Sequence, residues 1–285
     1  MAVTNVIPEL WAREMVEVLK NNLVAAGICN TTIASALNME GDKFHIPVAG
    51  TTTTAAYVEG TTTISYTSPT DTVKTLTIDQ DQYAALNISD EEVKQANQDY
   101  AREYARDIAF NLAEDIDVQV MGQYTNAGLD SYETGTTPWQ LGATGGDFPK
   151  LIASLHRQLD AAKARKEGRF LVLNAVGIEA ARLYTAGRAT SLGDDVTVNG
   201  AVGQFMGMTL IQSNNVVNAS SVDHSLCGVM GRNIALATQI SPADIEALRL
   251  EGSYGTGVRA RAKWGSVVYR PQTLIDVNLN ETLLA

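Results

Sequence analysis

The three histidines, the side chains best suited to acid–base chemistry or zinc binding near neutral pH, are far apart in the sequence. His45 lies in a strand-like segment, His156 lies on the surface of a predicted helix beside Arg157, and His224 belongs to a third element. A zinc site in a protein usually shows short spacings such as HxxxH or CxxC, and the chain contains neither. We therefore expect no metal site and interpret the histidines as structural or exposed residues.

Two glycine clusters have the composition of phosphate-binding loops but lack the elements that flank such loops. Residues 142–146 (GATGG) lead into a predicted helix, yet no hydrophobic strand precedes them and no Gly-Lys-Thr follows. Residues 255–257 (GTG) belong to a predicted turn over residues 252–257 that is followed by strand-like alternation. A dinucleotide or P-loop site needs a strand, a glycine loop and a helix N-terminus in that order. We therefore expect no cofactor.

Serine and carboxylate side chains form no catalytic pattern either. No GxSxG motif surrounds a serine, so the nucleophile turn of the α/β-hydrolases is not predicted. Carboxylate groups of the kind that a glycosidase pairs occur at Asp194 and Asp195 and at Glu114, Asp115 and Asp117. We place the first pair in a turn and the second group on the solvent side of a long helix. The sequence therefore predicts that the chain is not an enzyme and has no catalytic residues.

The charge and the cysteines exclude further classes of protein. The 285 residues carry a formal net charge of −11, whereas proteins that bind DNA, RNA or anionic membranes need a cationic surface. Cys29 and Cys227 are too few for a disulfide scaffold, and we expect both to be buried. Neither a signal-peptide core nor an apolar run of about eighteen residues occurs. We expect an acidic, soluble protein that is made in the cytoplasm.

The N-terminal part of the chain predicts extended elements rather than a compact core. Residues 8–26 have the apolar stripe of an amphipathic helix that includes Trp11 and ends at Gly27. Residues 42–48 and 72–78 alternate as strands do. The segment between these strands is rich in Thr, Ala, Gly and Ser, and its larger apolar residues are Tyr57, Val58, Ile64 and Tyr66. We expect an extended two-stranded arm that has no core of its own; a disordered loop is the alternative.

A long helix is the strongest local prediction. Ser89 and Glu92 have the spacing of a capping box. Apolar residues then recur every three or four positions until Gly122. A helix of about 33 residues is roughly 50 Å long, far above the mean of about 11–12 residues in globular proteins. Such a helix is longer than one small core requires.

The second half of the chain predicts an α/β region followed by strands. Asp147 is a candidate cap for a helix that ends at Gly168, and residues 169–173 and 175–186 read as a buried strand and a helix. Strand patterns follow at 204–212, 226–230 and 234–240 and again from 244 onward. In one of these later strands, three cationic residues share a face, because they alternate with small or apolar residues: Arg259, Arg261 and Lys263.

The order of these elements resembles one known family. Residues 202–216 (VGQFMGMTLIQSNNV) and 252–277 (GSYGTGVRARAKWGSVVYRPQTLIDV) resemble phrases of the major capsid proteins of tailed bacteriophages, which have the Hong Kong 97-type fold. The resemblance covers nearly the whole chain and implies an α+β fold class. It implies an N-terminal arm (1–40), an extended E-loop (41–88), a spine helix with the first part of the P-domain (89–146), an A-domain (147–243) and C-terminal P-domain strands (244–285).

The resemblance also implies a function. It implies a shell subunit whose copies form hexamers and pentamers of an icosahedral head around double-stranded DNA, located in the virion, with no cofactor and no membrane. The partners that it implies are other copies of the chain, a separate scaffolding protein, a portal protein and decoration proteins. The E-loop is expected to lie over the adjacent subunit. The residues predicted to contact a neighbouring subunit are Trp11, Tyr57, Val58, Ile64, Tyr66, Arg259, Arg261 and Lys263.

Several alternatives stay open at the level of sequence. The three cations can form a solvated face, can meet acidic groups of a neighbouring subunit such as Asp79 to Asp81 at the end of the arm, or can face packaged DNA. Two other classes of protein are an encapsulin-like compartment of the same fold and an α/β enzyme with a β appendage.

Overall fold

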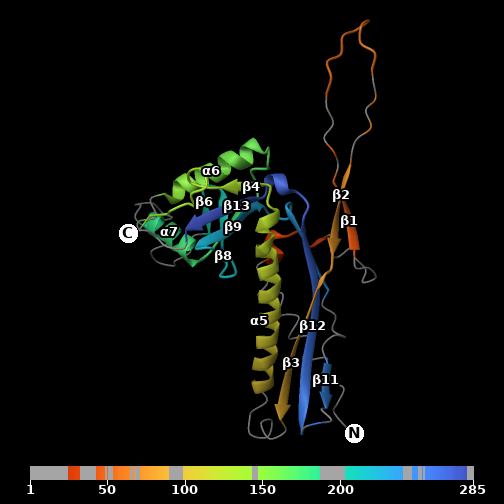
Figure 1. The fold of residues 1–285 in the computed structure, drawn as a ribbon, viewed down its shortest axis with the longest axis vertical. Helices are drawn as coiled ribbons and strands as arrows, with labels where there is room; N and C mark the ends of the chain where they lie inside the picture. The colour runs from red at the N-terminus through yellow and green to blue at the C-terminus, as the bar shows by residue number, and fades with distance from the viewer. Residues whose placement is uncertain are drawn as a thin grey trace.

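A computed structural model shows a long helix, three β-sheets and a projecting arm (Figure 1). The structure describes residues 25–32, 43–48, 54–64, 71–89, 99–142, 147–186, 203–239, 246–249 and 254–280, and the single positions 50, 66, 68 and 252. Helix α2 (Ala25–Ile28) is the described end of the predicted N-terminal helix, and it runs through Gly27 instead of ending there. The rest of that prediction lies outside the described residues.

The predicted long helix is present as α5 (Asp99–Met121), which continues into the 3₁₀ turn η1 (Gly122–Asn126). Its apolar stripe faces the core, because Ile108, Leu112, Ile116 and Val120 are all buried. The predicted first turns, residues 90–98, lie outside the described residues. Ser89, the predicted cap, is the last residue of the preceding strand.

A four-stranded antiparallel sheet runs along this helix. The 14-residue strand β12 (Gly255–Val268) pairs with β3 (Gln80–Ser89) on one side and with β10 (Ile234–Gln239) and β11 (Glu246–Arg249) on the other. Val258, Ala260, Ala262 and Trp264 are buried, as their alternation predicted. One detail corrects the prediction: residues 255–257 begin β12 instead of forming a turn. Residues 80–89, for which no strand was predicted, pair with β12 as strand β3.

The second half of the chain builds a seven-stranded mixed sheet with two helices, α6 (Phe148–Ala161) and α7 (Ala175–Ala186). This confirms the predicted helix–strand–helix order around the buried strand β5 (Arg169–Leu173). The other strands are β4 (Leu129–Ser131), β6 (Gln204–Phe205), β7 (Met208–Gln212), β8 (Val217–Ala219), β9 (Val222–Val229) and β13 (Ile275–Asn280).

Two local predictions in this region are wrong, and a third holds only in part. Residues 204–212 form a hairpin rather than one strand, because Met206 and Gly207 turn the chain with φ of 50° and 82°. Helix α6 ends at Ala161, well before Gly168, because Lys163 has the left-handed φ of 57°. Asp147 is the N-cap residue of α6, as predicted, but its carboxylate accepts a 2.6 Å bond from the Lys150 ammonium instead of a bond from a backbone N–H of the helix.

Two strands belong to a different sheet from the one that their position in the sequence predicted. Strand β13, expected beside the spine helix, pairs with β9 and β4 in the seven-stranded sheet. Strand β10, expected with the α/β region, pairs with β12. Each sheet therefore contains strands from both sides of the predicted boundary at residue 244. The domain boundaries themselves stay a prediction.

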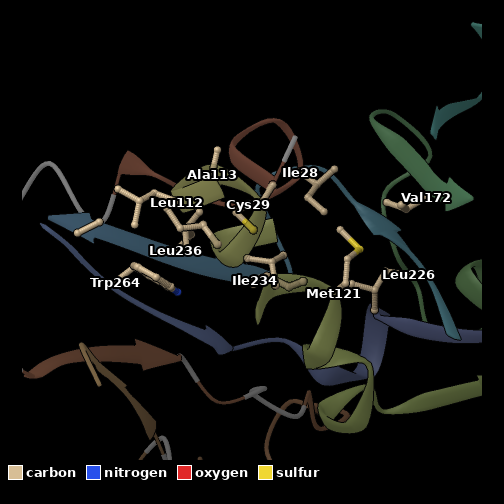
Figure 2. Close-up of a cluster of buried hydrophobic side chains, with 14 of the residues drawn as sticks. Ile28, Cys29, Leu112, Ala113, Met121, Val172, Leu226, Ile234, Leu236 and Trp264 are labelled. Atoms are coloured by element: carbon tan, nitrogen blue, oxygen red, sulfur yellow. The ribbon is translucent and has the colours of Figure 1, made fainter. Parts of the chain in front are cut away.

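One carboxylate that was placed on the solvent side of the long helix is buried. Asp117 is only 3% exposed, and its Oδ1 accepts a 2.9 Å hydrogen bond from the backbone N–H of Ala25. Figure 2 shows the apolar cluster at this place, which includes Ile28, Cys29 and Leu112. A buried carboxylate persists where it satisfies a donor, so Asp117 ties α2 to the spine helix.

Replacing Asp117 with alanine should lower the free energy of unfolding by about 1–3 kcal/mol, because the buried N–H of Ala25 loses its acceptor. Asp117→Asn keeps an acceptor oxygen and should cost less. Glu114→Ala, an exposed carboxylate on the same helix, is the matched control. Denaturant titration of the three variants measures the difference. Equal stability of Asp117→Ala and Glu114→Ala would contradict the tie.

Both cysteines are buried and free, as predicted. Burial raises the pKa of the Cys227 thiol to about 12, so this thiol stays protonated and unreactive. Within the described ranges, no helix has the length and apolar character needed to cross a bilayer.

Candidate assembly surfaces

The arm begins as a two-stranded ribbon, and its described residues 54–64 contain a turn but no helix or strand. Strands β1 (Lys43–Val48) and β2 (Thr72–Thr77) pair antiparallel, with Lys43 opposite Thr77 and Val48 opposite Thr72. Both strands were predicted from their alternation. In Figure 1 the described residues 54–64 between them project far beyond the rest of the molecule.

The described part of the arm leaves its apolar side chains in solvent. Tyr57, Val58 and Ile64 are 60–65% exposed and Tyr66 is 95% exposed. At the tip, the backbone N–H groups of Thr61 and Thr62 donate to the Val58 carbonyl at 3.2 and 3.0 Å, and Gly60 takes a φ of 78°. The tip is thus a hydrogen-bonded turn with no core beneath it. This exposed apolar surface is the kind that marks a contact with another molecule.

The base of the arm, by contrast, is fixed to the body. Ile46 and Leu76 are buried together with Ala235, Ala237 and Tyr269. The ribbon crosses strand β12 so closely at Gly265 that a Cβ there would lie under 3.0 Å from the Thr77 carbonyl. Only glycine allows this approach of two backbones. The body therefore holds the arm at one end and leaves its other end projecting.

The second surface is the cationic stripe, defined as Arg259, Arg261 and Lys263 on the outward face of β12. The Arg261 guanidinium binds Asp81 of β3 through two bonds, one of them the 2.6 Å Nε–Oδ1 bond. The Lys263 ammonium lies 3.9 Å from the same carboxylate. The hydrogen bond from Arg261, together with the charges of Arg261 and Lys263, lowers the pKa of Asp81.

These contacts assign Asp81 a partner within its own chain. The sequence had offered the Asp79 to Asp81 end of the arm as an acid for a neighbouring subunit's stripe, but strand β3 places Asp81 beside Arg261 and Lys263 of the same subunit. About half of each side chain in the Asp81–Arg261 pair is exposed. An exposed pair of this kind contributes little to stability, so the stripe remains a candidate contact surface.

Reversing the stripe with Arg259→Glu, Arg261→Glu and Lys263→Glu should leave the subunit folded but prevent closure into shells. The reason is that the three changes replace a cationic face with an anionic one in every copy. The reversed face would repel any acidic groups of a neighbouring subunit that the stripe contacts. High salt should partly mimic the defect in the unmodified protein. The matched control reverses three exposed cations elsewhere: Arg157, Lys163 and Lys166. Normal shells that package DNA normally would leave the stripe as a solvated face, whereas normal empty shells with altered packaging would make it a DNA-facing surface.

The remaining predicted residues fall in other places. Trp11 lies outside the described residues. His45 lies on β1, with Nδ1 3.0 Å from the Thr75 hydroxyl oxygen. His156 is less exposed than predicted, because its Nδ1 lies 2.6 Å from Nη1 of Arg169. Desolvation by burial, and then the charge of Arg169, lower the pKa of His156.

Three residues with notable positions in the structure were missed at the level of sequence. Arg169 is 1% exposed, and its Nη2 donates to Asp160 at 2.6 Å. Its position at the start of an apolar run is the sequence feature that could have indicated its burial. Gly265 was signalled by a glycine inside a strand pattern. Tyr83 is 78% exposed opposite Arg261, and no local pattern indicated its position.

Comparisons with known proteins were informative only at the level of structure. No protein-family model and no curated protein matches the chain. A solved structure from Mycobacterium phage Che8 is 25% identical, with a TM-score of 0.74 over 91% of this chain and 91% of that chain. The capsid structure of Cyanophage P-SCSP1u is 15% identical, with a TM-score of 0.66 over 90% and 87%. A virus-like particle from Pyrococcus furiosus is 10% identical, with a TM-score of 0.57 over 95% and 98%.

The spine helix with its sheet, the α/β region and the projecting arm thus form an α+β fold of the Hong Kong 97 type, which the chain shares with these phage structures. The fold class expected from the sequence is confirmed. The chain thus shares its fold with structures from phages, among them the capsid structure of Cyanophage P-SCSP1u and the capsid of Ralstonia phage GP4.

Proposed function

We propose that copies of this chain form the hexamers and pentamers of an icosahedral phage head that encloses double-stranded DNA, with each arm lying over the adjacent subunit. The observation that carries the proposal is the arm. Its base is buried against Ala235, Ala237 and Tyr269, while Tyr57, Val58, Ile64 and Tyr66 are exposed. A neighbouring subunit would supply the apolar surface that the arm lacks.

The proposal extends to the other parts of a tailed-phage head. Assembly would use a separate scaffolding protein, a portal protein at one vertex and decoration proteins on the outside. The role of the chain is structural, without catalysis and without a cofactor, and DNA is enclosed without recognition of its sequence. Segments 1–40, 41–88, 89–146, 147–243 and 244–285 are proposed to act as the N-terminal arm, E-loop, spine region, A-domain and returning P-domain strands.

Coexpression with the scaffolding protein, followed by negative-stain microscopy, tests the proposal. We expect closed hollow particles tens of nanometres across, built from capsomers of five and six subunits. The same expression with the apolar arm residues replaced is the control, because it should yield subunits without particles. A uniform dimer or tetramer under every condition of coexpression would contradict the proposal.

A cellular compartment is the second candidate function. The observation in its favour is the likeness to the Pyrococcus furiosus particle, which extends over nearly the whole of both chains but at a lower TM-score than the phage structures. The contents of purified particles separate the two functions. Particles that take up DNA through a portal support the phage head, and particles that enclose a protein cargo instead support the compartment.

A further inference from the structure

A row of polar side chains lies where the end of the spine helix meets the seven-stranded sheet. Asp276 of β13 is 5% exposed, and its Oδ2 lies 2.8 Å from Nδ1 of His224 on β9. The ring of His224 stacks on Tyr124 of η1, with the ring centroids 4.2 Å apart and the planes inclined by 22°. Through these contacts Asp276 is connected to the turn that continues α5.

The second oxygen of Asp276 has no partner. Its Oδ1 is buried and accepts no hydrogen bond. Asp130 of β4 occupies the position beside Asp276 in the parallel register, so two carboxyl groups stand next to each other. Among the described residues, the titratable groups that face Asp276 are therefore His224 from β9, Asp130 from β4 and, through the histidine ring, Tyr124 from η1.

We propose that Asp276, His224 and Asp130 form a proton-sensitive latch that holds η1 and the end of the spine helix against the seven-stranded sheet. With a proton on Asp276, the buried carboxyl is neutral and is not repelled by Asp130. Without that proton, the unpartnered Oδ1 carries negative charge in a buried place beside a second carboxylate. The latch is tighter in the protonated state and weaker in the ionised state.

The electrostatics agree with this geometry. Burial raises the pKa of Asp276 above its ordinary range, the hydrogen bond and charge of His224 oppose that rise, and the charge of Asp130 adds to it. A carboxyl whose pKa is higher in the folded than in the unfolded chain binds its proton more tightly when folded. Its stabilising contribution is fully present below the ordinary aspartate pKa and is lost as the pH rises through the raised value.

Asp276→Asn tests the latch in the purified, unassembled subunit, so the result does not depend on shell formation. The substitution keeps the shape of the side chain and removes its ionisation. Relative to the unmodified chain, the folding equilibrium constant of the variant should rise as the pH increases from the ordinary aspartate pKa to the raised pKa of Asp276, by up to about tenfold for each unit by which the pKa is raised. Asp130→Asn should give a smaller effect in the same direction. Asp79→Asn, an exposed carboxylate near the start of β3, is the control and should give none.

A second measurement keeps the proposal testable if Asp276→Asn folds poorly. Deuterium uptake of the unmodified chain, corrected for the intrinsic pH dependence of exchange, should rise with pH in peptides that cover 122–131 and 275–280. Uptake in a peptide from the middle of β12 should not change. A pH-independent difference between variant and unmodified chain, or uptake that is equally pH-dependent in β12, would overturn the latch.

Discussion

Subunits in which Tyr57, Val58, Ile64 and Tyr66 are all replaced by serine are expected to fold normally and to form no shells. The four side chains are exposed in the isolated chain, so their removal should not change the free energy of unfolding measurably. In a shell, full burial of each would contribute about 1.5–3 kcal/mol. The variant would lose this burial energy at every arm of the shell. Because a closed shell repeats the same contact in every subunit, the losses would add up and prevent assembly. Electron microscopy and sedimentation measure the outcome.

The control for this variant changes the same arm without removing large apolar surface. Thr54→Ser, Thr61→Ser and Thr63→Ser remove three methyl groups from exposed residues of the arm, and shells should still form. Chymotrypsin gives an independent readout, because cleavage after Tyr57 or Tyr66 should be fast in free subunits and slow in shells. Shells of normal yield from the four-serine variant would mean that the arm does not contribute the assembly contact.

Gly265→Val is the second substitution with a large expected effect. A side chain at this position collides with the backbone of Thr77, and a backbone cannot move aside as the end of a flexible side chain can. The base of the arm must therefore separate from β12, and the burial of Ile46 and Leu76 against Tyr269 is lost with it. Overpacking of this kind costs about 1–3 kcal/mol or more, and we expect both lower stability and failure of assembly because the arm is misplaced.

Gly252→Ala is the matched control for Gly265→Val, because a Cβ built at Gly252 meets no atom of the described residues within 4 Å other than its own chain neighbours. Denaturant titration and microscopy of particles should find this control unchanged. If Gly265→Val unfolds at the same denaturant concentration as the unmodified chain and still forms shells, the close crossing of the ribbon and β12 does not position the arm.

The sequence by itself determined the elements whose side-chain pattern repeats locally. The alternation in 42–48 and 72–78 predicted β1 and β2, and the three-to-four spacing from Ile108 to Val120 predicted the buried stripe of α5. It also determined that the arm has no core of its own, because too few apolar residues lie between the two strands. Such predictions succeed because the period of a helix or strand is set by the residue and its near neighbours.

The tertiary structure alone decided which distant segments meet. Asp117 belongs by spacing to a solvated acidic group, yet the N–H of Ala25 reaches it from 92 residues away and makes its burial possible. Asp81 finds Arg261 across 180 residues, and β10 and β13 each join the sheet that chain order did not assign to them. The pairing of Asp276 with His224 and the crossing at Gly265 have the same origin. The free energy of these contacts depends on how deeply the groups are buried and on where their partners lie. Both are set by the folded chain, and neither can be predicted from the local periodicity of the sequence.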